Sequence, residues 1–304
     1  RPEYINIRDK GDLDKSEAAF EENSFSVLDQ AYKSGVRYFV TAPSYGKGEA
    51  FLKAWDSIRN HEDVVLGTKW GYTYVANWEL GYIGKHEIKE HSIKKLLEQW
   101  QVSKEMLPKL KYYQVHSATF ESGILENDQV LSQLFMIKKA TGLKLGITTS
   151  GANQKQIIDA AINIVVNNEI LFDCFQVTYN VFEQSTFSIL KEAIKQGKTV
   201  IIKEALANGR VFKNENFAHY KQPYALLEEL SKKYKVGFDA IALRFVMDSL
   251  KPTYVLSGAS NTDQLSQNLK ARDFELTSED IDTLKSLKIV PQVYWEERTA
   301  LHWN

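Results

Sequence analysis

The stretch Tyr38 to Gly48, YFVTAPSYGKG, joins a run of strand-forming residues to a loop rich in turn-forming residues. Its first four residues are β-branched or aromatic, which is typical of a buried strand, and Pro43, Ser44 and the glycines then end that strand. Tyr45 therefore follows directly after an apolar strand, beside Gly46, in a poor place to bury a ring. The position indicates a functional hydroxyl at the end of the strand.

Similar short runs of apolar, β-branched and aromatic residues recur along the chain, with helical patterns between them. The strand candidates are Arg37–Thr41, Val64–Thr68, Tyr112–Val115, Lys144–Thr148, Cys174–Thr178, Thr199–Lys203 and Tyr254–Ser257. The helical stretches are Ser24–Lys33, Glu49–Asn60, Glu90–Leu107, Asp128–Thr141, Gln154–Asn167, Thr186–Gln196, Tyr224–Tyr234, Phe238–Ser249 and Asp263–Leu269. Strands that are apolar on both faces and alternate with helices predict a parallel sheet. Because no Pro/Gly/Ser-rich linker divides the chain, the pattern favours a single α/β domain over residues 1–304, a (β/α)8 TIM barrel with a C-terminal tail.

A (β/α)8 barrel requires an eighth strand, and the only candidate before the helix at Ser24 is the short segment Tyr4–Ile7, YINI. Either this segment serves, or the first strand precedes Arg1. The stretch Gly71–Glu90 is too long for a tight turn after a strand, and we expect it to form a wall of the site. The segment from Ser278 starts with a helix-capping pattern, and the tail after it either closes over the pocket or packs outside. Four aromatic residues either line an apolar pocket or pack the long loop: Trp70, Tyr72, Tyr74 and Trp78.

Composition excludes several classes of function. Hydrophobic residues make up 43% of the chain, charged residues 25%, and the net charge is −1, so there is neither a basic surface for nucleic acid nor an acidic tail. No apolar run approaches the roughly 20 residues that span a bilayer. Cys174 is the single cysteine, which excludes an internal disulfide and fits a small core residue in a reducing compartment. We expect a cytoplasmic protein with a small-molecule substrate and no nucleic-acid or membrane partner; the sequence leaves its oligomeric state open.

Three polar side chains stand at the ends of successive predicted strands. Tyr45 follows the first clear strand, Lys69 ends the next one, and His116 follows the strand after that. In a barrel the carboxyl ends of the strands meet at one face, so we expect these side chains to converge there. An ammonium beside a phenol lowers the phenol pKa from its usual value near 10, and an imidazole can orient a substrate oxygen. The pattern predicts a proton-transfer group.

Five segments in this order carry a resemblance to a known family: GVRYFVTAPSYG, LGTKWGY, YYQVHSA, FQVTYN and LSGASNTDQLSQNL. Together they resemble the aldo-keto reductase superfamily, over a region from about Ser24 to Ala271. The resemblance implies a (β/α)8 barrel that transfers hydride between a nicotinamide cofactor and a carbonyl or alcohol substrate. By position, it implies that Tyr45 is the proton donor, Lys69 the activating lysine and His116 the histidine that orients the substrate.

The resemblance also implies a cofactor site, with NADP as the expected cofactor and NAD as the alternative, and no metal. Its residues are Ser150, Gln176, Lys203, Leu206, Gly258, Ala259, Ser260, Asn261, Gln264 and Asn268. Ser150 and Gln176 match residues that bind the nicotinamide carboxamide, and the last six surround the adenosine phosphate. Lys203 falls where many members stack a tyrosine on the nicotinamide ring, which a lysine cannot do. Neither Gly258 nor Gln264 is the basic residue that members preferring NADP often have there.

The resemblance makes Val40 unusual. The family has the pattern F-D-T-A, whereas this chain has Phe39-Val40-Thr41-Ala42. In the family the carboxylate pairs with the lysine and holds its ammonium toward the tyrosine, and a valine side chain cannot accept a hydrogen bond. We therefore expect Lys69 to be less well oriented and activity to be impaired. The strand pattern alone predicts only one more apolar residue at this position.

Other interpretations of the sequence concern a histidine pair and two rival functions. The histidines of HEIKEH, His86 to His91, are five residues apart and do not share a helix face, so we expect a solvated loop entering a helix rather than a metal site.

The main rival to a reductase is a non-catalytic relative that binds the cofactor as a sensor or partner module. A barrel lyase or isomerase that uses Lys203 with Glu204 is a further alternative.

Overall fold

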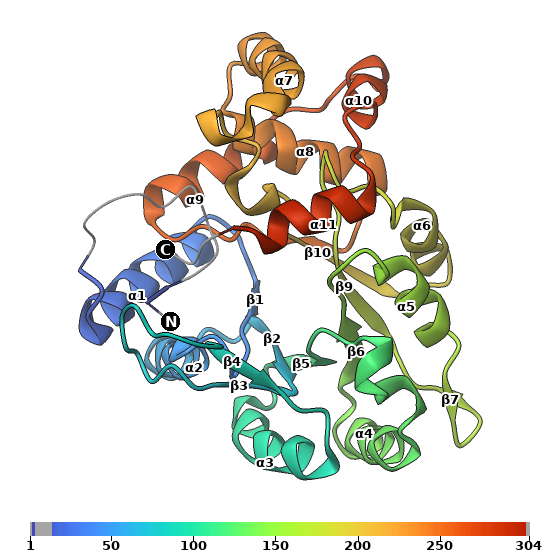
Figure 1. Ribbon diagram of the computed structural model, residues 1–304. Coiled ribbons are helices and arrows are strands. Elements are labelled where there is room, and N and C mark those ends of the chain that lie inside the picture. Colours follow the sequence, from blue (N-terminus) through green and yellow to red (C-terminus); the bar gives the residue numbers. More distant parts are fainter. Residues whose placement is uncertain (1, 4–13, 302–304) are drawn as a thin grey trace. The chain divides into compact units, whose positions relative to one another are not determined.

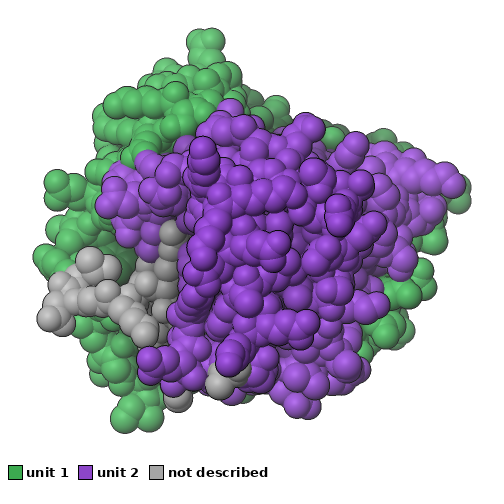
Figure 2. Space-filling model, turned by 90° about the horizontal axis from the view of Figure 1, so that it is seen from above, with its two compact units in different colours: residues 1–3, 14–176 green, residues 4–13, 177–304 purple. Residues whose placement is uncertain are grey.

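The computed structural model describes residues 2–3 and 14–301 (Figure 1). The candidate first strand, Tyr4–Ile7, lies outside the described residues, as do His302 and Trp303 of the tail. The chain divides into two compact units (Figure 2), which we call the N-terminal unit, Asp14–Gln176, and the C-terminal unit, from Val177 onward.

The strands follow one another in the main sheet in the same order as in the sequence. They are β1 (Tyr38–Val40), β2 (Val65–Trp70), β5 (Leu110–Val115), β6 (Lys144–Thr148), β9 (Cys174–Thr178), β10 (Thr199–Lys203) and β11 (Tyr254–Val255). In the N-terminal unit β1–β2, β2–β5, β5–β6 and β6–β9 pair in parallel, and in the C-terminal unit β10–β11 pair in parallel. Three of the predicted strands, at β6, β9 and β10, have the predicted bounds.

Helices separate these strands, as the alternating pattern predicts (Figure 1). In the N-terminal unit they are α1 (Glu17–Lys33), α2 (Gly48–Arg59), α3 (Ile93–Ser103), α4 (Asp128–Thr141) and α5 (Gln154–Ala161). In the C-terminal unit they are α6 (Phe187–Lys195), α7 (Lys221–Tyr234), α8 (Phe238–Leu250), α9 (Thr262–Leu269), α10 (Ser278–Lys285) and α11 (Pro291–Thr299). None of the helices among the described residues is long and apolar enough to cross a bilayer.

Close packing between strands explains two small residues in the N-terminal unit. Cys174 is fully buried, as predicted for a small core residue. A Cβ atom at Gly146 would lie 2.2 Å from the Cys174 sulfur and 2.3 Å from its carbonyl oxygen. Because backbone cannot yield as a flexible side chain can, only glycine fits at this crossing of β6 and β9.

Two helix ends differ from their predicted positions, because capping and turn residues determine where the helices begin and end. Helix α1 begins seven residues before Ser24, because the Ser16 side chain accepts a hydrogen bond from the Ala19 amide and caps the helix there. Helix α5 ends at Ala161 rather than Asn167. Asn167 and Asn168 have φ values of 50° and 63° and make the turn between two short antiparallel strands, β7 (Val165–Val166) and β8 (Glu169–Ile170).

The long segment after β2 is not a plain loop. It contains an antiparallel pair, β3 (Tyr72–Tyr74) and β4 (Glu87–Lys89), in which Thr73 lies opposite Ile88. Trp78, between these strands, packs edge-on against Phe20 of α1, so this aromatic residue holds the segment onto the helices.

Candidate active site

The structure brings Tyr45, Lys69 and His116 together in the N-terminal unit. Tyr45 lies in the loop between β1 and α2, Lys69 in β2, and His116 directly after β5. The Lys69 ammonium is 4.7 Å from the centre of the Tyr45 ring, and the Tyr45 and His116 rings are 5.8 Å apart at 83°. The phenol ring therefore lies close to a cation and an imidazole, two groups that can assist proton transfer at a phenol.

Lys69 is almost completely buried, with 1% of its surface exposed. Its ammonium donates a hydrogen bond of 2.9 Å to the backbone carbonyl of Thr41, the residue after β1. A carbonyl carries a dipole rather than a full negative charge. This bond therefore fixes the position of Nζ but balances only a small part of its positive charge. In the β1–β2 register Val40 pairs with Gly67, two residues before Lys69, so the Val40 and Lys69 side chains leave the sheet on the same face.

His116 is held by contacts on both its ring and its backbone. Its Nδ1 lies 3.4 Å from the Ser44 hydroxyl, and its amide donates to the Trp70 carbonyl across the β2–β5 pair. The Tyr72 ring lies 4.8 Å from the imidazole. Tyr72 is thus a second phenol at the site, and it lines the site rather than only packing the loop.

His91, which the sequence placed in a solvated loop, is buried beneath His116, so that prediction is wrong. Its Nε2 donates a hydrogen bond of 2.9 Å to the His116 carbonyl, and only 8% of its surface is exposed. Gly71, at φ 102°, makes room for it, because a Cβ there would lie 2.2 Å from the His91 ring. Gln99 of α3 accepts a bond from the Gly71 amide and donates one to the Tyr72 carbonyl, both of 2.8 Å. The corner after β2 is therefore fixed from two sides.

Burial of His91 predicts that stability depends on pH. Burial, and next the nearby Lys89 charge, lowers the His91 pKa from 6.5 to about 4. Because the folded pKa lies below the unfolded one, this stabilisation is fully present above pH 6.5 and is lost as the pH falls toward 4. Urea unfolding of wild type should therefore lose about 2 kcal/mol between pH 7.5 and pH 5 through this residue. His91→Gln should lose correspondingly less; an equal loss in both proteins would contradict this assignment.

Two predicted cofactor residues also belong to the N-terminal unit. Ser150 follows β6 and precedes Gly151, whose φ is 97°. Gln176 is buried in β9, and its side-chain oxygen accepts a bond of 3.2 Å from the Gln114 amide of β5. In the β2–β5 register Gln114 pairs with Lys69, so the Gln114 and Lys69 side chains lie on the same face of the sheet.

The other predicted cofactor residues belong to the C-terminal unit. Lys203 ends β10, donates a 3.0 Å bond to the Thr178 hydroxyl and lies 3.9 Å from the Glu204 carboxylate. Arg298 of α11 donates a 2.8 Å bond to the same carboxylate. Burial of Glu204 opposes ionisation, but the Lys203 and Arg298 charges outweigh it and lower its pKa to about 2. Leu206 precedes a short 3-10 turn after this cluster.

The segment from Gly258 to Asn268 forms a capped helix start. Asn261 caps α9 by accepting a bond from the Gln264 amide, and the Gln264 side chain accepts from the Ser260 amide and lies within hydrogen-bond distance of its hydroxyl. Asn268 is buried and donates to the carbonyl and the hydroxyl oxygen of Ser257. These bonds hold the backbone of the segment in one conformation.

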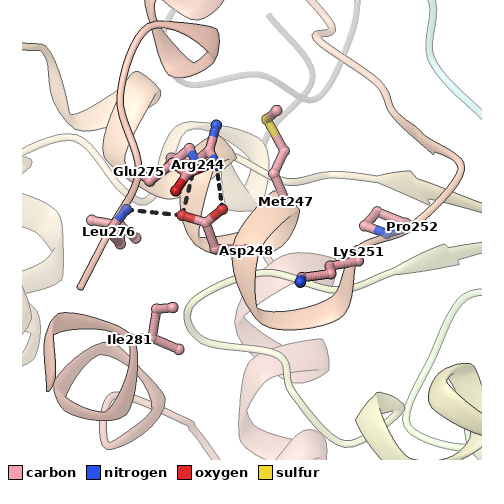
Figure 3. Close-up of a pocket in the computed structure, with 8 residues that line it drawn as sticks. All are labelled: Arg244, Met247, Asp248, Lys251, Pro252, Glu275, Leu276 and Ile281. Atoms are coloured by element: carbon pink, nitrogen blue, oxygen red, sulfur yellow. Dashed lines mark hydrogen bonds and ion pairs between the residues drawn. The ribbon is translucent and has the colours of Figure 1, made fainter. Parts of the chain in front are cut away.

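A separate cavity of about 450 Å³ lies in the C-terminal unit, and its lining residues include an ion pair that joins two turns of one helix (Figure 3). Its wall is built around the ion pair of Arg244 with Asp248, and the Asp248 carboxylate also accepts a bond from the Leu276 amide. Lys251 and Pro252 place it before the start of β11, at the end of the strand away from its carboxyl terminus. None of the predicted site residues lines it, so we assign it no part in the chemistry.

A sequence profile of the Aldo/keto reductase family matches residues 12–289. The chain belongs to the aldo/keto reductase family. It is accordingly an oxidoreductase of a family that generally uses nicotinamide cofactors and acts on small carbonyl compounds.

Individual aldo/keto reductases resemble the chain over most of its length. An aldo-keto reductase from Emericella nidulans is 24% identical, over 92% of this chain and 74% of its own length. A probable aryl-alcohol dehydrogenase from Saccharomyces cerevisiae is 23% identical, over 88% of each chain. Among solved structures, an aldo-keto reductase from Bacillus halodurans in its holo form has a TM-score of 0.67 at 19% identity, covering 89% of this chain and 88% of its own. A glycerol dehydrogenase from Gluconobacter oxydans has the same TM-score at 20% identity, covering 88% and 85%. The structural likeness confirms the predicted (β/α)8 fold class.

Several residues of the candidate site are not predictable from motifs. Ser44, His91 and Gln99 hold the backbone or ring of a predicted residue, and each comes from a position that strand-end reasoning does not select. The one available signal was His91, the second histidine of HEIKEH, because a histidine that follows a strand can fold back under the sheet. Gln114 was also missed, although it lies in β5, two residues before His116.

Proposed function

We propose that this chain is an NAD(P)H-dependent reductase that transfers hydride to a small aldehyde or ketone, and in reverse oxidises the alcohol. The observation that carries the proposal is the Tyr45 ring held against both the Lys69 ammonium and the His116 imidazole. The names of two relatives, an aryl-alcohol dehydrogenase and a glycerol dehydrogenase, support an alcohol–carbonyl pair as the substrate class.

The chain's own residues supply the proton chemistry. Lys69 favours the phenolate of Tyr45, which eases loss of the phenolic proton to the developing alkoxide oxygen. His116, whose Nδ1 lies 3.4 Å from the Ser44 hydroxyl, is the imidazole that would donate a hydrogen bond to the substrate oxygen. The bound nicotinamide supplies the hydride. Tyr72 forms apolar surface beside the His116 ring and helps to exclude water from it.

NADP is the cofactor we propose, with NAD as the alternative. Gly258 has φ 61°, and no described atom lies within 4 Å of where its side chain would stand, so backbone there can approach a phosphate. The Ser260 hydroxyl and the Asn261 amide are suitable donors for an adenosine phosphate, and Asn268 supports this segment through its bonds to Ser257. Ser150, Gln176, Lys203 and Leu206 remain predicted contacts of the nicotinamide end.

We further propose that turnover is limited by Val40. The Thr41 carbonyl positions Lys69 but carries no full negative charge, so the buried ammonium is stabilised less in its charged form, and oriented less firmly toward Tyr45, than it would be with an adjacent carboxylate. The single, buried cysteine fits a reducing compartment, and we place the reaction in the cytoplasm.

Cofactor titration followed by an aldehyde assay tests this proposal. Tryptophan fluorescence should report binding of NADPH, and of NADH more weakly. Asn268→Ala should weaken NADPH binding about tenfold, because the bonds to Ser257 that fix the loop are lost. Gln267→Ala, an exposed neighbour on α9, is the matched control and should leave binding unchanged.

Turnover is then measured as oxidation of NADPH with a reactive aromatic aldehyde. Slow oxidation, matched by formation of the alcohol, supports the reductase. Binding without any turnover would favour the sensor or partner module, and failure of both nucleotides to bind would overturn the proposal.

A further inference from the structure

Lys89 is a cation beside the candidate active site that the proposed chemistry does not use. It ends β4, and in the β3–β4 register it pairs with Tyr72, so the two side chains lie on the same face of this antiparallel pair. The Lys89 ammonium lies 5.8 Å from the centre of the Tyr72 ring, and that ring lies 4.8 Å from the His116 imidazole. The ammonium and the imidazole therefore lie next to the same aromatic ring, all within the N-terminal unit.

The two faces of the β3–β4 pair carry the opposite of the usual pattern. On an antiparallel pair with one face toward the protein, apolar side chains normally point inward and charged ones toward solvent. Here Ile88 has 53% of its surface exposed, whereas Lys89, the next residue of the strand, is half-buried on the face where Tyr72 meets His116. The strand therefore directs its charged residue toward the candidate site and its apolar residue away from it.

The charge of Lys89 is only weakly compensated. Its ammonium donates a bond of 3.0 Å to the Thr119 hydroxyl, which is neutral, and no carboxylate among the described residues forms an ion pair with it. Glu121, two residues after Thr119, acts on Lys89, but it is exposed, where water and salt screen its charge. Burial lowers the Lys89 pKa, and Glu121 opposes this only in part. An anion that displaces water from this ammonium would therefore be stabilised there.

The donors of Lys89 suit a carboxylate. An ammonium has three N–H donors, and one of them is used by Thr119, which leaves two for the oxygens of a ligand. A single cation balances a monoanionic carboxylate, whereas phosphate dianions are usually held by several cations or by backbone amides. The Tyr72 ring beside both groups offers an apolar surface for the part of the ligand between its carboxylate and its carbonyl.

We propose that Lys89 determines substrate specificity, by binding the carboxylate of an aldehyde or ketone whose carbonyl oxygen lies at His116 and whose body packs along the Tyr72 ring. The proposal rests on the reductase function above and names its substrate class, carbonyl compounds that carry a carboxylate. Lys89 takes no part in hydride or proton transfer, so its effect is on the choice between charged and neutral substrates.

The kinetic test compares para-carboxybenzaldehyde with its methyl ester, which has the same aldehyde but no charge. In wild type kcat/KM should be about tenfold higher for the acid than for the ester. Lys89→Gln, which keeps a donor for Thr119 and removes only the charge, should abolish this preference, and Lys89→Arg should retain most of it. Lys85→Gln, at an exposed lysine between β3 and β4, is the matched control and should leave the preference unchanged within twofold. A wild type without the preference, or a preference that survives in Lys89→Gln, would overturn the proposal.

Equilibrium binding separates this proposal from the reductase function. Isothermal titration calorimetry with the two aldehydes, with and without NADP⁺ and in the absence of reduced cofactor, measures their dissociation constants without turnover. Wild type should bind the acid about tenfold more tightly than the ester, and Lys89→Gln should bind the two equally. Selective binding through Lys89 in a protein that reduces neither aldehyde would refute only the reductase function. Equal dissociation constants for acid and ester in wild type would refute the carboxylate site at Lys89.

Discussion

Tyr45→Phe should lower kcat for aldehyde reduction by about 10³-fold, while NADPH binds with unchanged affinity. The substitution removes only the hydroxyl and keeps the ring that contacts Lys69 and His116. General acid catalysis by a positioned group contributes roughly 10² to 10⁴ in rate, and a site of three groups offers no second proton donor in the same place.

Tyr72→Phe is the matched control, because Tyr72 is a second phenol beside the same imidazole. Burial, and next the Glu87 charge, raises the Tyr72 pKa to about 12, so this phenol holds its proton and is a poor donor. Its substitution should change kcat less than fivefold. A large loss in Tyr72→Phe with activity retained in Tyr45→Phe would reassign the proton donor. Steady-state kinetics at matched folded fraction measure both.

Val40→Asp should raise kcat about tenfold without changing the NADPH dissociation constant. Position 40 lies on the same face of the sheet as Lys69, so a carboxylate there can pair with the buried ammonium, keep it charged and hold it toward Tyr45. A tenfold gain corresponds to about 1.4 kcal/mol of transition-state stabilisation, which is modest for a charge pair away from water.

Val40→Asn separates charge from shape in this prediction. It offers a hydrogen-bond acceptor of nearly the same size without a charge, and should raise kcat less than threefold. Val40→Asp protein that folds, binds NADPH and shows no gain would mean that the missing carboxylate does not limit turnover. An equal gain in both variants would mean that orientation of Lys69, rather than its charge balance, is limiting.

The parts of the fold that local sequence specifies were predictable. The strands at β6, β9 and β10 agree with their predicted bounds, because each is a short apolar run flanked by strong turn or helix signals. The β3–β4 pair was missed because its strands lie twelve residues apart within a stretch rich in turn residues, and their pairing is a tertiary interaction. Early capping by Ser16 was missed because the apolar period starts later than the helix.

The site was predictable where it depends on strand ends and not where it depends on contacts between elements. Tyr45, Lys69 and His116 meet because parallel strands direct their carboxyl ends to one edge. The acceptor of Lys69 is a backbone carbonyl, which no residue type reveals. The resemblance predicts that Val40 replaces an aspartate of the family, but it does not predict the carbonyl that accepts from the lysine.

The most direct test of the account is transfer of a labelled hydride. NADPH carrying deuterium at C4 of the nicotinamide, as each of its two epimers, is incubated with the protein and a reactive aromatic aldehyde, and the alcohol is analysed by mass spectrometry. We predict that one epimer delivers deuterium to the carbinol carbon, and that Tyr45→Phe forms this product about 10³-fold more slowly. An alcohol without deuterium from either epimer, or no alcohol from a protein that binds NADPH, would contradict the assignment of this chain as a nicotinamide-dependent reductase.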